Sequence, residues 1–272
     1  MLWSLSVING YSIAARDGRL GAVSDFLFED DTWQVRWLVV DTGKWLSGRK
    51  VLLPPSILGR IDPDEREFSV KVTMQQVRDS PDIDSDRPVS RQMETNIYDY
   101  YGWSPYWGNG LFTDSYGYVG GAMVGSPLLG FRRPEEHVED AQRDADDPHL
   151  RSAAEVTGYH IHASDGEIGH VTDFLLHDAD WSIRYLTVDT KNWWSGKKVL
   201  ISPRSARGID WRKKLVNLDV DRQKVKDSPP YDASTTVDRA YEEHFDGHYG
   251  YGRILPVAQA SPEEPGAQVR TQ

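Results

Sequence analysis

The sequence predicts an all-β protein, built from two small antiparallel barrels in tandem that are each followed by a short amphipathic helix. The first observation is an internal repeat: residues 10–55 and 158–203 align without a gap at an offset of 148 positions, and 25 of these 46 pairs are identical. The second is that each copy contains short runs rich in β-branched and aromatic residues. The third is that turn-forming residues separate these runs, a spacing typical of small barrels, whose closure removes exposed sheet edges.

Each copy opens with a predicted β-hairpin. Residues 11–15 alternate between apolar and small or polar side chains, as a strand does. Asp17-Gly18 follows as the turn, because glycine accepts a positive φ. Residues 21–28 form the return strand. The second copy has the corresponding parts at Asp165-Gly166 and 169–176.

Three more strands are predicted in each copy. Residues 33–41 (WQVRWLVVD) are the longest β-type run, after a turn at residues 30–32. A loop at 41–48 leads to a strand at 50–53, which ends at a pair of prolines. The last strand is 67–73. The counterparts of the longest and the last strand are residues 181–189 and 215–221.

A short amphipathic helix is predicted after each barrel. Apolar residues recur there at every fourth position, which places them in one stripe along a helix. We expect each helix to pack on its own barrel or on the sister copy. The stripes are Val89, Met93, Ile97 and Tyr101 in the first copy, and Val237, Tyr241, Phe245 and Tyr249 in the second.

These patterns divide the chain into four parts. Residues 1–101 hold the first barrel and its helix, with 1–9 as a lead-in that pairs as an extra edge strand. Residues 102–156 read as a linker, aromatic and glycine-rich at first and then charged. Residues 157–251 hold the second barrel and helix. Residues 252–272 are expected to be a disordered tail.

Composition narrows the classes of function. The net charge is −11, which makes general nucleic-acid binding unlikely, because such binding needs a basic face. The chain has no cysteine, so disulfides and cysteine-based zinc sites are excluded. No apolar run approaches the roughly 20 residues that span a bilayer, and the N-terminus does not read as a signal peptide. A cytoplasmic location and the absence of a cofactor are the resulting expectations.

Two residue patterns, present in both copies, resemble the PRC-barrel family, which is named after the cytoplasmic domain of the photosynthetic reaction centre H subunit. The first is D-G-x2-G-x-V-x-D-F-L, and the second is R-x-L-x-V-D-T followed by W and S-G. The resemblance implies a small antiparallel β-barrel used for docking, as on the reaction centre and in a ribosome maturation factor. The residues concerned are Asp17, Gly18, Gly21, Asp25, Arg36 and Asp41, and Asp165, Gly166, Gly169, Asp173, Arg184 and Asp189.

The repeated charged residues suggest two interpretations. Asp25, Arg36 and Asp41, with their counterparts, have the chemistry of an acid–base set. Alternatively they are strand-end residues whose hydrogen bonds and ion pairs hold the barrel together. We favour this structural role, because nothing in the pattern brings them to one site, and we expect no catalytic residue.

Histidines gather in the second copy alone. His160 and His162 are two positions apart, so on a strand they point to the same face; His170 and His177 follow. The matching positions in the first copy are Ser12, Ala14, Ala22 and Glu29. Because the two copies share no set of ligands, we expect exposed strand histidines rather than a metal site.

Two groups of residues are candidates for partner binding. The tryptophans of the loops after the longest strand, Trp45, Trp193 and Trp194, either anchor a partner or cover the end of their own barrel. The second group is a basic run in copy two, opposed only by Asp210. It is a solvated face, or a docking site for an acidic partner, an anionic lipid surface, RNA or the acidic linker. It comprises Arg204, Arg207, Arg212, Lys213 and Lys214.

These observations favour a non-enzymatic binding or assembly protein, a scaffold or adaptor, that holds a protein partner and self-associates through its barrels. One alternative is a peripheral subunit of a photosynthetic or other membrane complex, which contacts the membrane surface without spanning it. The other is a metal-dependent hydrolytic enzyme with its site between the barrels, which requires the histidines and a carboxylate to converge.

Overall fold

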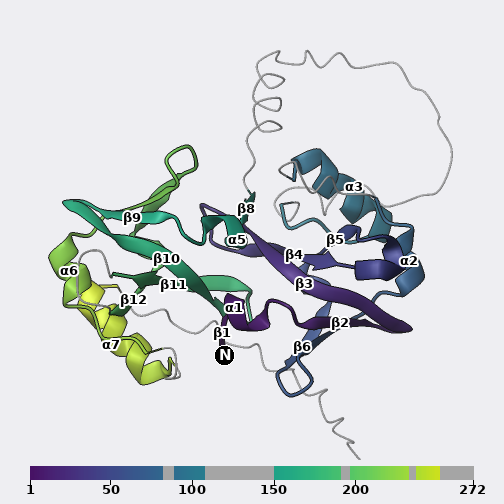
Figure 1. Ribbon diagram of the computed structural model, residues 1–272, viewed down its shortest axis with the longest axis horizontal. Coiled ribbons are helices and arrows are strands. Elements are labelled where there is room, and N and C mark those ends of the chain that lie inside the picture. The colour runs from purple at the N-terminus through teal and green to yellow at the C-terminus, as the bar shows by residue number, and fades with distance from the viewer. Residues whose placement is uncertain (82–88, 108–149, 191–196, 233–236, 252–272) are drawn as a thin grey trace, which may run out of the picture.

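The computed structural model describes residues 1–81, 89–107, 150–190, 197–232 and 237–251. The prediction of an all-β protein is confirmed: two seven-stranded sheets, each with a few short helices, form two lobes side by side (Figure 1).

The first lobe is a strongly bent sheet with the strand order β5-β4-β3-β2-β7-β6. Neighbouring strands are antiparallel except β2 and β7, which are parallel. The strands are β2 (Ser12–Ala15), β3 (Gly18–Glu29), β4 (Val35–Asp41), β5 (Lys50–Leu53), β6 (Leu58–Asp62) and β7 (Glu67–Val70).

The second lobe repeats this topology, with the order β12-β11-β10-β9-β14-β13 and the same single parallel pair, β9 with β14. The internal repeat therefore encodes one fold twice. The strands are β9 (His160–Ala163), β10 (Gly166–His177), β11 (Ser182–Asp189), β12 (Lys198–Ile201), β13 (Ala206–Asp210) and β14 (Leu215–Leu218).

The seventh strand of each sheet comes from the other copy. β1 (Leu2–Ser4) pairs with β10, and β8 (Leu150–Ser152) pairs with β3. A one-turn helix follows each of them, α1 (Leu5–Ile8) and α5 (Ala153–Val156), and lies against the same borrowed sheet. The expected edge strand in residues 1–9 thus exists, but on the sister copy. Residues 150–156, expected at the end of the linker, form its counterpart.

The expectation of closed barrels is corrected. Among the described residues no pairing joins β5 to β6, or β12 to β13, so each sheet stays open along this seam. The cause lies in the connecting residues. Pro54-Pro55 and Pro203 have no N–H to donate to a ladder, and they open the short 3-10 turns Pro55–Ile57 and Pro203–Ser205 instead.

The strands that the sequence predicts are present, with three differences. β2 ends at Ala15 and β3 begins at Gly18, so the turn is residues 16–17 rather than 17–18. β4 begins at Val35, because Trp33 has a φ of 57° and still belongs to the turn. β6 was not predicted; it follows two prolines and contains Gly59, and its pairing with β7 is irregular.

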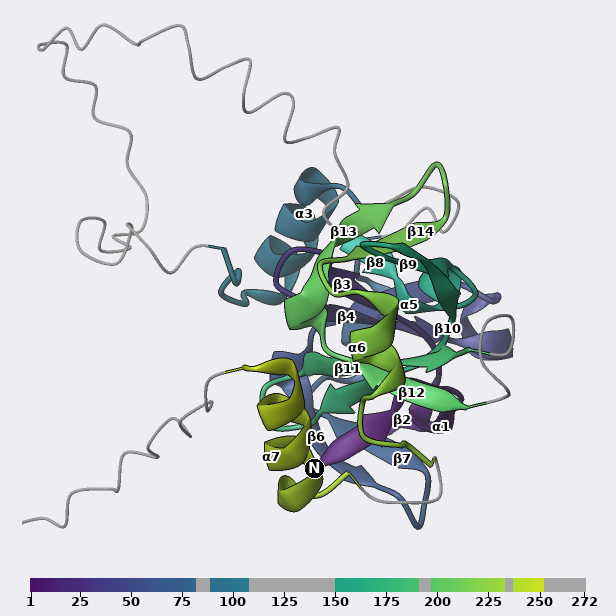
Figure 2. The same cartoon turned by 90° about the vertical axis from the view of Figure 1, so that its left-hand side faces the viewer.

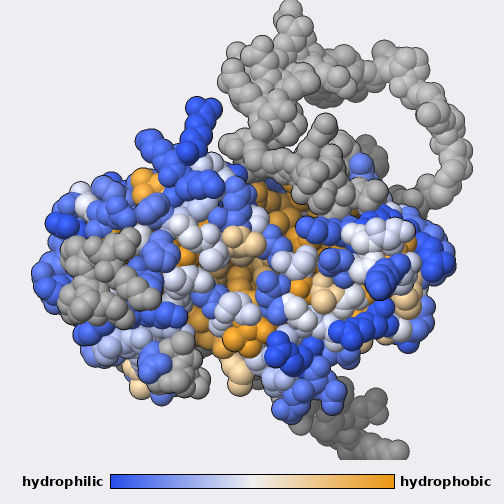
Figure 3. Space-filling view, in the orientation of Figure 1, coloured by the Kyte–Doolittle hydropathy of each residue, from blue (hydrophilic) through white to orange (hydrophobic). Residues whose placement is uncertain are grey.

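The largest hydrophobic core of the described residues runs through both lobes. Buried residues of the two copies form one continuous cluster. Across the junction, Phe28 and Phe174 have ring centroids 5.8 Å apart, and Phe68 and Trp181 6.2 Å. Figure 3 shows hydrophilic surface over both lobes and hydrophobic surface mainly where they meet.

The two predicted amphipathic helices are α3 (Arg91–Tyr101) and α7 (Arg239–Tyr249). Each covers the outer face of the sheet of its own copy. α3 packs on Trp37, Val39 and Leu52, whereas α7 packs on Leu175, Tyr185 and Leu200. Val89 and Val237 precede the N-caps Ser90 and Asp238, so each helix begins two residues after the first residue of its predicted stripe. Two five-residue helices, α2 (Met74–Arg78) and α6 (Arg222–Lys226), complete the lobes.

Within the described ranges, no helix combines the length and apolar character needed to cross a bilayer.

Candidate docking surface

The junction between the lobes has an approximate twofold relation. Gln34 forms an isolated antiparallel β-bridge with Ser182, the residue at the equivalent position of the second copy. The N–H of Val35 donates to the carbonyl of Trp181 at 2.9 Å, and the N–H of Ile183 donates to the carbonyl of Trp33 at 2.8 Å. Both tryptophans are left-handed, with φ of 57° and 54°. This conformation is costly for a bulky residue, so the junction maintains it in both copies.

Asp25 fastens the borrowed element of the first lobe. Its carboxylate accepts hydrogen bonds from the hydroxyl of Ser152 at 2.5 Å and from the N–H of Ala154 at 3.0 Å, both on the β8–α5 segment. It also accepts one from the N–H of Phe26. Burial raises the pKa of Asp25, against the lowering effect of these donors. The residue therefore joins the two copies.

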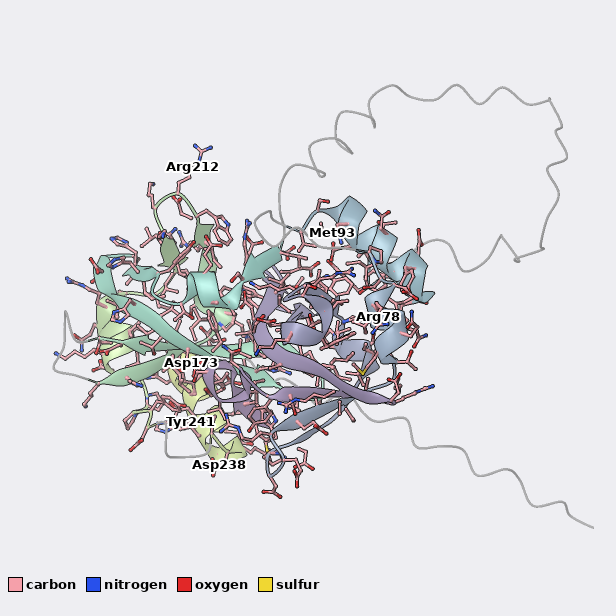
Figure 4. All side chains as sticks on the ribbon, turned by 45° about the vertical axis from the view of Figure 1, so that its right-hand side comes forward. Arg78, Met93, Asp173, Arg212, Asp238 and Tyr241 are labelled. Atoms are coloured by element: carbon pink, nitrogen blue, oxygen red, sulfur yellow. The ribbon has the colours of Figure 1, made fainter. Side chains whose placement is uncertain are left out.

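Asp173 does the same in the second lobe. Its carboxylate accepts hydrogen bonds from the hydroxyl of Ser4, and from the N–H and hydroxyl of Ser6 at 3.1 and 2.7 Å. Figure 4 shows the labelled Asp173 on the second lobe. Each aspartate thus binds the exchanged segment of the other copy, and we call this pair of contacts the clasp.

The other repeated residues make separate local contacts. Asp17 and Asp165 each accept the N–H of the first residue of the following short helix at 2.8 Å. Arg36 pairs with Glu29 at 2.6 Å, and Arg184 pairs with Asp180 at 2.5 Å. Asp41 accepts the N–H of Gly43, and Asp189 is buried.

The repeated glycines serve turns and close packing. Gly18 and Gly166 have φ of 158° and 145° in the hairpin. A Cβ at Gly21 would lie 2.0 Å from the carbonyl oxygen of Asp41, and one at Gly169 equally close to that of Asp189. These residues hold strands in place, and within the described residues they do not converge on one site.

Sequence reasoning missed a buried polar cluster in the first copy. Glu94 on α3 is only 2% exposed and accepts hydrogen bonds from the indole N–H of Trp37 at 2.7 Å and from the hydroxyl of Tyr106 at 3.1 Å. Arg91 pairs with it at 3.3 Å. Burial raises the pKa of Glu94. The cluster holds α3 and residues 103–107 against β4; its sequence signal is a glutamate inside an apolar stripe.

Three of the four histidines lie on one face of the second lobe. His160 pairs with His170 across β9 and β10, and His162 stands opposite Glu167. Nδ1 of His160 lies 2.8 Å from the carboxylate of Glu167. His177 lies at the far end of β10, 3.0 Å from Asp180. In the part of the chain that the structure describes, no three His, Asp or Glu side chains are arranged to hold a metal ion.

Of the three candidate tryptophans, the structure describes Trp45 alone. The indole of Trp45 donates to the carbonyl of Leu20 and packs partly buried on the core, so it covers the end of its own lobe. Trp193 and Trp194 lie outside the described residues.

The basic run splits into two places. Arg204 lies over the ring of Tyr251 at 4.3 Å, on the side of α7. The remaining cations belong to the β13–β14 hairpin, and Arg212 extends from its tip away from the lobe (Figure 4). Lys213 forms an exposed pair with Asp210 at 3.3 Å. Within the described residues, Arg207, Arg212 and Lys214 form no ion pair, and all three are exposed.

Beside these cations lies an open hollow of about 460 Å³, lined by Gly208, Ile209, Asp210, Trp211, Arg212 and Asn217. Two residues hold its tryptophan in place. The guanidinium of Arg151 stacks on the Trp211 ring at 4.2 Å and pairs with Asp30 of the first lobe at 2.6 Å. Tyr159 meets the same ring edge-on. The hairpin, which we call the basic end, is thus anchored to the rest of the molecule.

The β6–β7 turn of the first lobe has the same backbone and the opposite charge; we call it the acidic end. The carboxylate of Asp62 accepts the N–H groups of Asp64 and Glu65 at 3.0 Å, as Asp210 accepts that of Lys213 at 3.1 Å. Each turn closes on a left-handed residue, Arg66 or Lys214, with φ of 52° and 51°. Copy two has Arg212 and Lys213 where copy one has Asp64 and Glu65.

Comparison with known proteins agrees with this fold. The model of the PRC-barrel domain matches residues 4–76 and again residues 150–225. An uncharacterised protein of Deinococcus radiodurans is 35% identical over 75 residues, which are 28% of this chain and 27% of the relative. The match thus spans only about a quarter of that relative's length. Both family matches include an exchanged one-turn helix. Since they cover more than half of the residues, the chain belongs to the PRC-barrel family, of which it carries two copies.

Proposed function

We propose that this protein is a non-enzymatic docking module whose basic end binds an acidic surface of a protein partner. The observation that carries the proposal is the open hollow lined by Trp211 and Arg212, on a hairpin whose exposed Arg207, Arg212 and Lys214 form no ion pair within the described residues. An indole wall supplies apolar contact area, and the cations select for carboxylates. The same turn in the first copy has Pro63 in place of the tryptophan, and Asp64 and Glu65 in place of Arg212 and Lys213.

Binding fits this site better than catalysis does. A catalytic site needs a nucleophile, a base or a metal held together by mutual hydrogen bonds. The described hollow contains one carboxylate and one guanidinium, and Asp210 is already engaged by its own turn. The histidine face lacks a metal-binding arrangement within the described residues. The geometry thus supports recognition of a surface.

The test is the binding of a fluorescent glutamate-rich peptide, measured by anisotropy at 0.1 M salt. The change is R207S/R212S/K214S. Since each exposed charge pair contributes about 0.2–1 kcal/mol, we expect the loss of three charges to lower the affinity by about 3- to 150-fold. The matched control is R19S/K71S/R239S, which removes three exposed cations outside both ends and should leave the affinity unchanged. Equal binding by the triple variant and the original protein would refute the proposal.

A second arm separates the alternative of a membrane-surface subunit. Vesicles with and without an anionic phospholipid are sedimented with the protein. The proposal predicts peptide binding and no sedimentation above the level of neutral vesicles. Sedimentation with anionic vesicles alone, together with a lack of peptide binding, would instead support docking at a membrane surface.

A further inference from the structure

We infer that a second copy of this chain supplies the acidic partner: the acidic end of one molecule docks at the basic end of the next. The inference rests on the proposed function, because it uses the same hollow. It commits to one occupant, the β6–β7 turn around Asp64 and Glu65.

Shape is the first argument. The acidic end is a convex turn whose residues 62–66 are all exposed. The basic end offers an open hollow of about 460 Å³ at its flank. A projecting hairpin turn is a compact shape for such a hollow, and both turns are stiffened by aspartate-to-backbone hydrogen bonds. Neither end therefore needs to order itself on binding.

Charge is the second argument. In the acidic end the one opposing cation of the turn, Arg66, is turned toward its own lobe, with its guanidinium 5.2 Å from the Tyr11 ring. Within the described residues, Asp64 and Glu65 form no ion pair at the tip. The basic end presents Arg212 and Lys214, which form no ion pair within the described residues. Opposite charges brought together at contact favour this pairing and disfavour like ends meeting.

Placement is the third argument. The two ends lie at opposite extremes of the molecule, with β13 and β14 above and β6 and β7 below in Figure 2, and the hairpins likewise separated in Figure 1. They cannot meet within one molecule. Between molecules, the contact joins two different surfaces, so a docked pair still exposes one free basic end and one free acidic end. Such a heterologous contact extends into open chains unless its rotation closes a ring.

The contact is weak by construction. Exposed charge pairs contribute little individually, and at about 0.1 M salt the Debye length is only about 10 Å. The net charge of −11 also opposes association of copies. We therefore expect reversible assembly that grows with concentration and vanishes at about 0.5 M salt. A locally high concentration, as on a shared partner, would favour it.

The experiment is sedimentation velocity of the full chain at increasing concentration and 0.1 M salt. Two charge-reversal variants are compared with the original protein. R212E/K213E/K214E makes both ends acidic, and D64K/E65K makes both ends basic. We expect the original protein to show a rising average mass, and each variant alone to stay at the mass of one chain. Mixing the two variants should restore heavier species, because acidic ends then meet basic ends.

Each outcome decides the question. Absence of concentration-dependent mass in the original protein overturns the inference, and so does failure of the mixture to associate when both variants unfold at the original urea midpoint. Self-association of either variant alone also overturns it. If the glutamate-rich peptide binds while the chain stays monomeric, the proposed function stands and only the identity of the partner is wrong. If neither is seen, both fail.

Discussion

Removal of the Asp25 carboxylate tests the clasp between the two copies most sharply. The change Asp25→Ala deletes three hydrogen bonds, two of them to residues 152 and 154 of the other copy. At about 1 kcal/mol each, these bonds amount to about 3 kcal/mol. Burial raises the pKa of Asp25, so the cost of ionising the carboxyl group in the folded protein at pH 7 offsets part of this stabilisation. We therefore expect a loss of about 2 kcal/mol in the free energy of unfolding at pH 7.

The sign of the pH dependence follows from the raised pKa. A folded pKa above the unfolded value means that stability is greatest in acid and declines as pH rises through the folded pKa. The difference between the original protein and Asp25→Ala should hence be larger at pH 4 than at pH 7. Asp25→Asn, which retains an acceptor for the N–H of Ala154 and carries no charge, should cost less than half as much at pH 7.

The assay is urea unfolding combined with amide hydrogen exchange. In Asp25→Ala, exchange should accelerate in residues 150–156, while residues 2–8, held by Asp173, should keep their protection. A loss of stability without faster exchange in 150–156, or an Asp25→Asn variant as damaged as Asp25→Ala, would refute the clasp.

Three further predictions follow from the packing. Gly169→Ala places a Cβ about 2.0 Å from a backbone oxygen, so it should lower the free energy of unfolding in urea by more than about 2 kcal/mol. Gly247 lies within helix α7, and a Cβ there would meet no neighbouring atom, so Gly247→Ala should stabilise the protein by about 0.5–1 kcal/mol. A Gly169→Ala variant as stable as the original protein would contradict the close approach. Glu94→Gln keeps an acceptor for Trp37 and removes a buried carboxyl group whose pKa is raised. The stability of this variant relative to the original protein should therefore increase from pH 4 to pH 7. A difference that does not change with pH would count against burial as the cause of the raised pKa. Arg151→Ala removes the ion pair with Asp30 and the guanidinium that stacks on Trp211. It should destabilise the protein by about 2–3 kcal/mol and weaken binding of the glutamate-rich peptide. Unchanged peptide affinity would show that Trp211 does not depend on this contact.

Much of each lobe could be predicted from local sequence. The Asp17-Gly18 hairpin, the run 33–41 and the amphipathic helices have periodic patterns that short-range rules detect. The repeat then guaranteed that both copies adopt one topology. The open seam was missed because the effect of Pro54 and Pro203 on closure depends on which strands lie at the two ends of the sheet.

The exchange between copies was not predictable in the same way. The sequence predicted an edge strand in residues 1–9 and a linker at 102–156, because a three-residue strand has no pattern that reveals it or selects its partner. Asp25 looks like a strand-end carboxylate until Ser152 and Ala154 are placed beside it. The basic run was visible in the sequence, whereas the separation of Arg204 from the hairpin, and the hollow beside Trp211, depend on tertiary packing.

The central claim is that the two copies form one interlocked unit, in which each copy supplies a strand to the sheet of the other. The direct measurement is to introduce a specific protease site within residues 108–149 of the full chain, cleave the folded protein, and determine the mass in solution without denaturant. Because β1–α1 and β8–α5 each complete the other copy's sheet over a shared core, we predict that the two fragments stay together at micromolar concentration. Two fragments that separate, each folded and monomeric, would contradict the account.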